Sequence, residues 1–288
     1  MSTLSLPDVM SYAQVAAADD KSSTLASPNR VPESNWHKRL IEGLEENQFQ
    51  LYGQKIVSIQ PHIELPGEHV EVLLRLNTHA RGIIGPAAFM PTARRLRLLQ
   101  EIDRWVIQAV FERAGAERRL GLPRVYYAIN LSGPAIGDAG LLLFILEQFA
   151  ATNADPATIC FEFTETVAVR HLRRAQYLIA VLKERGCTFS LDDFGQGLSS
   201  LTHLKHLRVD YLKIDGSFVK NLATDKVDHA IVDAVQRMAH AMGLKTIAEY
   251  AESQAIIDKL QEICVDLAQG YQIHNPEPFD APQPRQSV

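Results

Sequence analysis

Short apolar or β-branched runs alternate with helical patterns along most of this chain, and this alternation restricts its possible folds more than any other feature. Eight runs have the length and composition of strands, at residues 50–56, 70–76, 125–131, 158–163, 188–192, 211–214, 245–248 and 265–268. Apolar residues recur at helical spacing between most of them, at 97–114, 139–150, 167–185, 227–242 and 254–263. The pattern predicts an α/β fold class with a mostly parallel sheet. Eight units suit a closed (β/α)8 barrel of the TIM type, and a doubly wound open sheet is the alternative.

Polar side chains at the ends of the predicted strands favour the barrel. In a barrel the carboxyl ends of the parallel strands converge on one face, so residues distant in sequence meet in one pocket. In an open sheet the same residues would be spread along a line and could not share a metal ion. The candidates, in chain order, are Gln54 with Lys55, Glu71 with Arg75, Asn130, Glu162 with Glu165, Asp192 with Asp193, Lys213 with Asp215, Glu249, and Gln269.

Composition excludes several classes of protein. The 288 residues are 46% hydrophobic with a net charge of −5, so the chain can build a large core but has no basic footprint for long nucleic acid. Neither a membrane-spanning apolar run nor a secretory signal is evident in the sequence. Cys160, Cys187 and Cys264 lack CxxC spacing, which predicts buried, reduced thiols in a cytoplasmic protein.

The two ends of the chain differ from its middle. Residues 1–34 are rich in Ser, Ala, Asp and Pro and are interpreted as a linker or tail. A helix is expected at 36–46, and one barrel domain is expected over 35–280. The stretch from Pro276 to Val288 contains four prolines, which predicts an irregular end, with 281–288 as a C-terminal tail.

Asp192 and Asp193 form the most suggestive pair. Two adjacent carboxylates are often only a solvated turn or a helix cap. Here they follow a buried strand, where repulsion and desolvation disfavour two negative charges unless cations compensate them. Ligands that are all oxygen favour Mg²⁺ or Mn²⁺ over Zn²⁺. Gly195 and Gly197 would let the following loop bend close to a ligand.

Three further positions have competing interpretations. Glu162 alone would suit a solvated strand face, but the flanking apolar residues favour a buried barrel strand. Strict alternation would place Glu162 on the same face as Thr164 and Thr166, and Glu165 on the opposite face. Lys213, within a mostly apolar strand, is either a surface lysine or the partner of buried carboxylates. Glu249 follows an apolar strand directly and suits chemistry, although acids in the first turn of a helix are also common.

These residues lie in motifs that resemble those of the EAL domain family, in the family's order, over about residues 36–278. The runs are 71–75 (EVLLR), 129–132 (INLS), 161–165 (FEFTE), 191–195 (LDDFG), 211–215 (YLKID), 247–249 (IAE) and 268–271 (AQGY). The resemblance implies a modified TIM barrel whose first strand is antiparallel. It also implies two Mg²⁺ or Mn²⁺ ions, hydrolysis of cyclic di-GMP (c-di-GMP) to linear pGpG, a homodimer, and a place in a larger multidomain signalling protein.

The resemblance also assigns roles. It implies that one metal is held by Glu71, Asn130, Glu162 and Asp192, and the second by Asp192 and Asp193 with Glu249. By the same resemblance Lys213 positions the attacking water, and either it or Glu249 handles the water's proton. Glu165 is expected to stabilise the loop after Asp193. Gln54, Arg75, Asp215 and Gln269 are expected on the substrate side of the site.

The chain departs from the family pattern at several positions. Val72 replaces the alanine of the eponymous motif, Arg94 stands where an acid is common, and Tyr250 replaces a common glycine. Because none of these changes deletes a metal ligand, the enzyme is the preferred interpretation. A receptor that binds c-di-GMP without turnover is the alternative. Residues 7–31 faintly resemble the end of a GGDEF cyclase domain, so 1–34 could be the remnant of an upstream domain, but the cyclase motif itself is missing.

Overall fold

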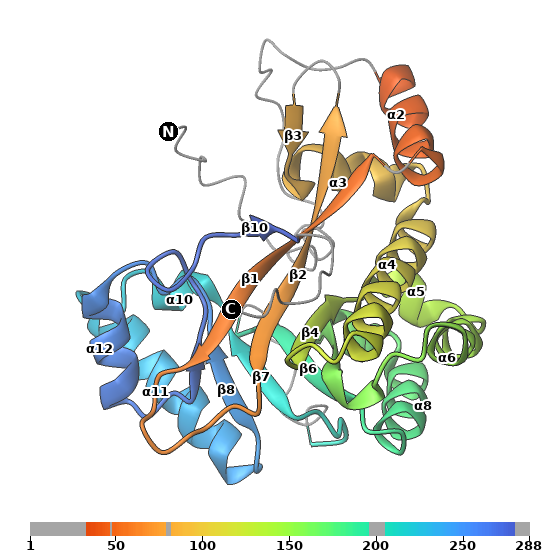
Figure 1. Cartoon of the computed structure of the whole chain (residues 1–288). Helices are drawn as coiled ribbons and strands as arrows, with labels where there is room; N and C mark the ends of the chain where they lie inside the picture. Colours follow the sequence, from red (N-terminus) through yellow and green to blue (C-terminus); the bar gives the residue numbers. More distant parts are fainter. Residues whose placement is uncertain (1–32, 47, 79–81, 196–204, 280–288) are drawn as a thin grey trace, which may run out of the picture.

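A closed barrel forms the centre of the molecule. The structure is a computed structural model that describes residues 33–46, 48–78, 82–195 and 205–279 (Figure 1). Within these residues the barrel strands follow the order β1-β9-β8-β7-β6-β5-β4-β2, and pairing of β1 with β2 closes the ring. The strands are β1 (Phe49–Ser58), β2 (Glu68–Thr78), β4 (Val125–Asn130), β5 (Ile159–Thr164), β6 (Thr188–Phe194), β7 (Tyr211–Ile214), β8 (Lys245–Ala248) and β9 (Leu267–Ala268). All eight predicted strands are therefore present, and the barrel, not the open sheet, is confirmed.

The first strand runs against both of its neighbours. β1 pairs antiparallel with β2 and with β9, whereas the remaining barrel pairs are parallel. The antiparallel first strand implied by the family resemblance is confirmed. The β1–β2 hairpin sets Gln54 directly opposite Glu71, which brings a mid-strand glutamine to the level of the strand ends.

Helices surround most of the barrel. Figure 1 shows α4 (Leu99–Arg119), α6 (Leu141–Thr152) and α8 (Leu172–Lys183) on one side of the β1–β2 hairpin, with α11 (Lys226–Ala241) and α12 (Gln254–Glu262) on the other. The other elements of the described residues are α2 (Glu33–Glu45), β3 (Gly82–Ile84), α3 (Pro86–Arg95), α5 (Gly133–Gly137), the 3-10 turn η2 (Pro156–Thr158), α7 (Glu165–Arg170), α10 (Gly216–Val219) and β10 (Glu277–Pro278).

Two predicted elements need correction. The helix expected at 167–185 is two helices, because α7 ends at Arg170 and the non-helical His171 precedes α8. β5 ends at Thr164, whose hydroxyl accepts a hydrogen bond from the backbone N–H of Val167 and caps α7. Glu165 and Thr166 are consequently helical, so the strand alternation proposed for them is wrong.

The C-terminal stretch is more ordered than its prolines predict. Glu277 and Pro278 form β10, which pairs with Gly53 and Tyr52 of β1. The ring of Phe279 lies over Gly53, where an added Cβ would come within 2.4 Å of it. This segment therefore packs on the β1–β2 hairpin, which has no crossover helix of its own. The tails expected at 1–34 and 281–288 lie almost entirely outside the described residues and stay predictions.

The apolar interior has two parts. A large cluster lies between the barrel wall and the helices, and a small one inside the barrel contains Ile56, Ala128, Ile247 and Leu267. Each member of the small cluster is two residues from a polar candidate, namely Gln54, Asn130, Glu249 or Gln269. Since side chains two apart in a strand share a face, these apolar residues form a floor directly below a polar layer.

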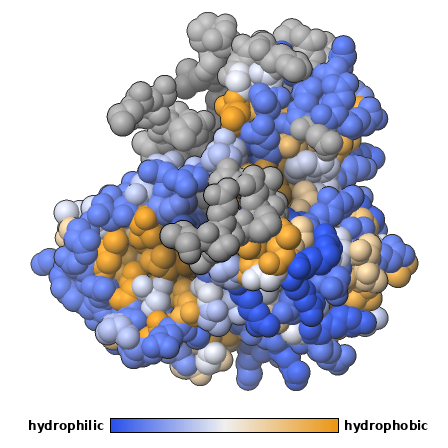
Figure 2. Space-filling model, in the orientation of Figure 1, coloured by the Kyte–Doolittle hydropathy of each residue, from blue (hydrophilic) through white to orange (hydrophobic). Residues whose placement is uncertain are grey.

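The surface contrasts with this interior. Figure 2 shows a mainly hydrophilic face on which apolar residues gather in a few areas. Among the described helices, none has both the length and the apolar character needed to cross a membrane. The expectation of buried thiols holds for Cys187, whereas Cys160 is partly buried. It is wrong for Cys264, which is exposed at the turn between α12 and β9 with a φ of 64°.

Candidate active site

Apart from Lys55, which is partly exposed and pairs with Glu68, the candidate residues from the sequence lie in or around the polar layer above the floor. All of these side chains are buried, although most are charged. They are Gln54, Glu71, Arg75, Asn130, Glu162, Glu165, Asp192, Asp193, Lys213, Asp215, Glu249 and Gln269. Parallel strands of the barrel end at a common face, which is why residues from β2 to β9 share this layer.

Lys213 lies at the centre of the layer and is fully buried. Its Nζ is 3.2 Å from Glu71 Oε2, 3.2 Å from Glu162 Oε2, 3.5 Å from Asp192 Oδ1 and 2.8 Å from Glu249 Oε1. A buried lysine requires such partners, because an unpaired ammonium inside a protein is very costly. The interpretation of Lys213 as the partner of buried carboxylates is correct, and the surface-lysine alternative is wrong.

A chain of amide groups fixes Glu71. Asn130 Nδ2 donates to Glu71 Oε1 at 2.8 Å, and Gln269 Nε2 donates to Glu71 Oε2 at 2.6 Å. Gln269 Nε2 also donates to Gln54 Oε1 at 2.9 Å, and Gln54 Nε2 donates to the carbonyl oxygen of His274 at 2.9 Å. Residues from β1, β2, β4 and β9 are thereby linked around one carboxylate.

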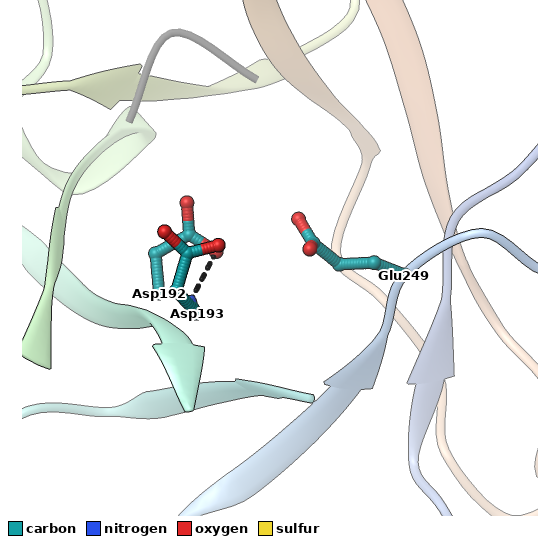
Figure 3. Close-up of side chains that lie close together, drawn as sticks. All are labelled: Asp192, Asp193 and Glu249. Atoms are coloured by element: carbon teal, nitrogen blue, oxygen red, sulfur yellow. Dashed lines mark hydrogen bonds between the residues drawn. The ribbon is translucent and has the colours of Figure 1, made fainter. Parts of the chain in front are cut away.

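Asp192, Asp193 and Glu249 form a second group. Figure 3 shows the two aspartates of β6 facing Glu249 at the end of β8, and one carboxylate oxygen from each lies within 4.8 Å of the others. The register of β6 with β7 shifts between Leu191 and Phe194. Asp193 has a φ of 55°, and its N–H donates to Asp192 Oδ1 at 2.9 Å. This local distortion lets two consecutive carboxylates face the same space, although an ordinary strand would point them to opposite faces.

The pKa values reflect one lysine among several carboxylates. Burial raises the pKa of Glu162 to about 8, with Glu71 and Asp192 acting in the same direction and Lys213 opposing. Burial raises the pKa of Asp192, and that of Glu249 well above its usual range. Burial lowers the pKa of Lys213, but the surrounding carboxylates outweigh it and hold this pKa well above its ordinary value. The layer thus has a deficit of positive charge.

Divalent cations would fit this deficit of positive charge and the oxygen atoms that line the layer. Among the described residues, the buried oxygens Asn130 Oδ1, Glu162 Oε1 and Gln269 Oε1 have no hydrogen-bond partner. Buried oxygens rarely lack partners in folded proteins. The side-chain atoms that could bind a metal here are carboxylate or amide oxygens, which are the ligands that Mg²⁺ and Mn²⁺ prefer. The acidic cluster can therefore bind metal.

Three further candidates are also buried, and they make other contacts. Arg75 donates to the carbonyl oxygen of Leu74, and its guanidinium lies 5.3 Å from the centre of the Tyr52 ring. Asp215 caps α10 by accepting the N–H of Ser217 at 2.8 Å. Glu165 is buried at the start of α7. The loop that Glu165 is expected to stabilise includes residues 196–204, which lie outside the described residues.

One supporting residue escaped the sequence analysis. Asp103 of α4 is buried, and its Oδ2 accepts the N–H of Ser132 at 3.1 Å and the hydroxyl of Ser132 at 2.5 Å. Ser132 begins the turn just after Asn130, so Asp103 anchors the chain that presents this amide. An aspartate within the apolar stripe of an amphipathic helix was the available signal.

Val72 faces away from the site. It is adjacent to Glu71 in β2, and it packs in the outer apolar cluster between the barrel wall and the helices. The substitution at the eponymous motif therefore alters packing and not the polar layer.

Comparison with known proteins agrees with the geometry. The family model for the EAL domain matches residues 37–276. The chain belongs to the EAL domain family. It is 38% identical to cyclic di-GMP phosphodiesterase PdeB of Shewanella oneidensis over 92% of this chain, and 33% identical to PdeF of Escherichia coli over 84%. It spans about a third of these relatives, 30% of PdeB and 32% of PdeF.

Solved EAL structures share the fold. The c-di-GMP complex of the phosphodiesterase PaMucR superposes with a TM-score of 0.78 at 31% identity, covering 85% of this chain and 98% of that one. The FimX EAL domain of Pseudomonas aeruginosa bound to c-di-GMP gives 0.76 at 28% identity, covering 84% of this chain and 96% of that one.

Proposed function

We propose that this EAL domain is a metal-dependent phosphodiesterase that hydrolyses c-di-GMP to linear pGpG. The observation that carries the proposal is the group of Asp192, Asp193 and Glu249 facing one another beside the carboxylates held by Lys213. The names of PdeB and PdeF, and the c-di-GMP in the PaMucR complex, support it. Because the chain matches only about a third of the length of these relatives, the activity of the whole protein is proposed and not carried over from them.

We assign two divalent cations, Mg²⁺ or Mn²⁺, to the polar layer. Glu71, Asn130, Glu162 and Asp192 would hold one, and Asp192 and Asp193 with Glu249 the other. Bound there, the cations supply the positive charge that activates water and stabilises the transition state of phosphodiester cleavage. The deficit of positive charge and the unpartnered oxygens of Asn130 and Glu162 support this assignment.

The protein's own groups would position and deprotonate the attacking water. In the balanced reaction the water oxygen bonds to phosphorus, the bond to the ribose 3′ oxygen breaks, and the leaving oxygen takes up a proton. Glu249 faces Asp192 and Asp193 and also contacts Lys213, so it would be placed to accept the water's proton. Lys213 donates hydrogen bonds to Glu71 and Glu162 and would hold the water in line.

Gln54, Arg75, Asp215 and Gln269 would contact the nucleotide. Gln54 and Gln269 are already hydrogen-bonded to each other at the rim of the Glu71 group, which supports a shared role. Glu165 would support the loop after Asp193. A cytoplasmic location, a homodimer and a larger multidomain signalling protein complete the proposal, and they stay predictions from the sequence and the resemblance.

Separating binding from turnover tests the proposal. The purified protein is incubated with c-di-GMP in Mg²⁺, Mn²⁺ or EDTA, and the nucleotides are separated by chromatography. We expect pGpG with Mg²⁺ or Mn²⁺ and none with EDTA. Tight c-di-GMP binding with metal present but no pGpG would favour the receptor alternative and overturn the enzyme.

A further inference from the structure

Tyr250 has a strained backbone next to the active site. Its φ is 54°, in the left-handed region that bulky side chains rarely adopt. The neighbouring backbone enforces this conformation, because the N–H of Glu249 donates to Ile214 and that of Ala251 donates to Gln269. Strain of this kind persists only where surrounding contacts over-determine it, and it concentrates at functional sites.

The ring of Tyr250 packs closely against Gly216. An added Cβ at Gly216 would come within 1.9 Å of its Cδ2 atom, so no larger residue fits at Gly216 without displacing the ring. Gly216 directly follows Asp215, and Tyr250 directly follows Glu249. The tyrosine is only half-buried, so part of the side chain remains accessible beside the polar layer.

Lys220 supplies a cation at the same place. Its Nζ lies 4.1 Å from the centre of the Tyr250 ring, and the lysine side chain is exposed at the end of α10. Within the described part of the chain, Lys220 has no carboxylate partner. This exposed ammonium is therefore held by the tyrosine ring and not by a described carboxylate, in contrast to the buried Lys213.

We propose that Tyr250 and Lys220 form a guanine subsite at the mouth of the active site. The inference rests on the proposed function, because it assigns one base of the cyclic dinucleotide to these residues. The tyrosine ring supplies a stacking surface, which every base can use. The ammonium has only donors and matches the O6 and N7 acceptors of guanine, whereas adenine presents an amino group in place of O6. The pair thus both binds a base and selects guanine.

Two variants separate the two roles. Affinities for c-di-GMP and c-di-AMP are measured calorimetrically with Ca²⁺ as the metal, so that ligand is not consumed. Tyr250→Gly fits the left-handed backbone but removes the whole side chain, ring included, and should weaken c-di-GMP binding about tenfold or more. Tyr250→Phe keeps the ring and should stay within about threefold of the wild type. Lys220→Met should lower the preference for c-di-GMP over c-di-AMP about fivefold or more.

Two exposed residues outside the proposed subsite serve as controls. Tyr177→Ala and Lys226→Met change exposed residues outside the site and should alter neither affinity. Thermal unfolding confirms that each variant is folded. Wild-type affinity in Tyr250→Gly, or unchanged base preference in Lys220→Met, would overturn the subsite while leaving the proposed function intact. A wild-type protein that binds no c-di-GMP would overturn both.

Discussion

Lys213 Nζ lies 2.8 Å from Glu249 Oε1, and the two groups come from adjacent parallel strand ends of the barrel. The same ammonium contacts Glu71, Glu162 and Asp192. A single cation therefore holds together carboxylates that would otherwise repel one another. This arrangement gives Lys213 a structural role in the metal-free protein in addition to its proposed role in turnover.

Replacing Lys213 should separate these two roles. Lys213→Met leaves buried carboxylates without their counter-charge and should destabilise the metal-free protein by on the order of 3 kcal/mol. Mn²⁺ should restore much of that loss, because cations replace the ammonium. With metal bound, kcat should fall about 100-fold or more while c-di-GMP affinity changes far less. Chemical denaturation with and without Mn²⁺, together with steady-state kinetics, measures both effects.

Lys38→Met is the matched control, because Lys38 is 76% exposed and pairs with Glu42 on the surface of α2. It should change neither stability nor kcat appreciably. A Lys213→Met enzyme with near wild-type kcat would contradict the proposed role of Lys213.

Substitutions at Glu71 and Val72, which are adjacent in β2, should have very different effects on turnover. Glu71→Gln removes a proposed metal ligand and should nearly abolish turnover while weakening Mn²⁺ binding. Val72→Ala shortens a side chain in the outer core, so it should cost on the order of 2 kcal/mol of stability and change kcat by less than about tenfold. Cleavage of c-di-GMP that appears only in Val72→Ala would show that the valine, and not the polar layer, controls turnover.

The raised carboxyl pKa values predict how pH affects the metal-free protein. An acid whose folded pKa exceeds its unfolded value binds more protons when folded, so stability falls as pH rises between the two values. For Glu162 this window runs from the ordinary pKa of 4.5 to about 8, and Asp192 and Glu249 act with the same sign. Lys213 titrates above this window and does not reverse it.

Melting temperatures in EDTA should accordingly decline from pH 6.5 to pH 8, above the range in which His69, whose pKa burial lowers to about 4, acts in the opposite direction. Mn²⁺ should flatten the decline, because it binds the deprotonated carboxylates and releases their protons. Glu162→Gln should reduce the slope in EDTA. A metal-free protein whose stability rises over this range would contradict the raised pKa values.

Asp103 gives a test of long-range positioning. Asp103→Ala removes a buried acceptor from the N–H and hydroxyl of Ser132 and should cost about 1–3 kcal/mol of stability. It should also lower turnover moderately, because the turn that follows Asn130 loses its anchor. Glu101→Ala, at an exposed position of the same helix, is the control and should be neutral in both measurements. Unchanged stability in Asp103→Ala would mean that Ser132 holds the turn alone.

The order of the strands was predictable because each buried strand is a short apolar run that ends in a polar residue. Shorter elements were not: α3 contains Pro91, and α10 has only four residues, so neither shows a helical period. β10 was missed because Pro276 and Pro278 suggest irregular structure, whereas a proline is tolerated in a short strand at the edge of a sheet.

Candidate site residues were predictable by type, but their geometry was not. Periodicity places Asp192 and Asp193 on opposite faces, and only the distortion of β6 brings both into the layer. The position of Gln54 depends on the register of an antiparallel hairpin, which the strand pattern alone does not fix. The contact between Tyr250 and Gly216 joins two strand ends distant in sequence and has no signature in either motif.

The most direct measurement follows the oxygen of the attacking water. Wild-type protein with Mn²⁺ is given c-di-GMP in ¹⁸O-labelled water, and the product is analysed by mass spectrometry. The account predicts pGpG carrying one ¹⁸O atom on its terminal phosphate, and no product when EDTA replaces Mn²⁺ or when Glu71 is changed to Gln. Intact c-di-GMP after prolonged incubation with the metal-loaded protein, or equal cleavage in EDTA, would contradict it.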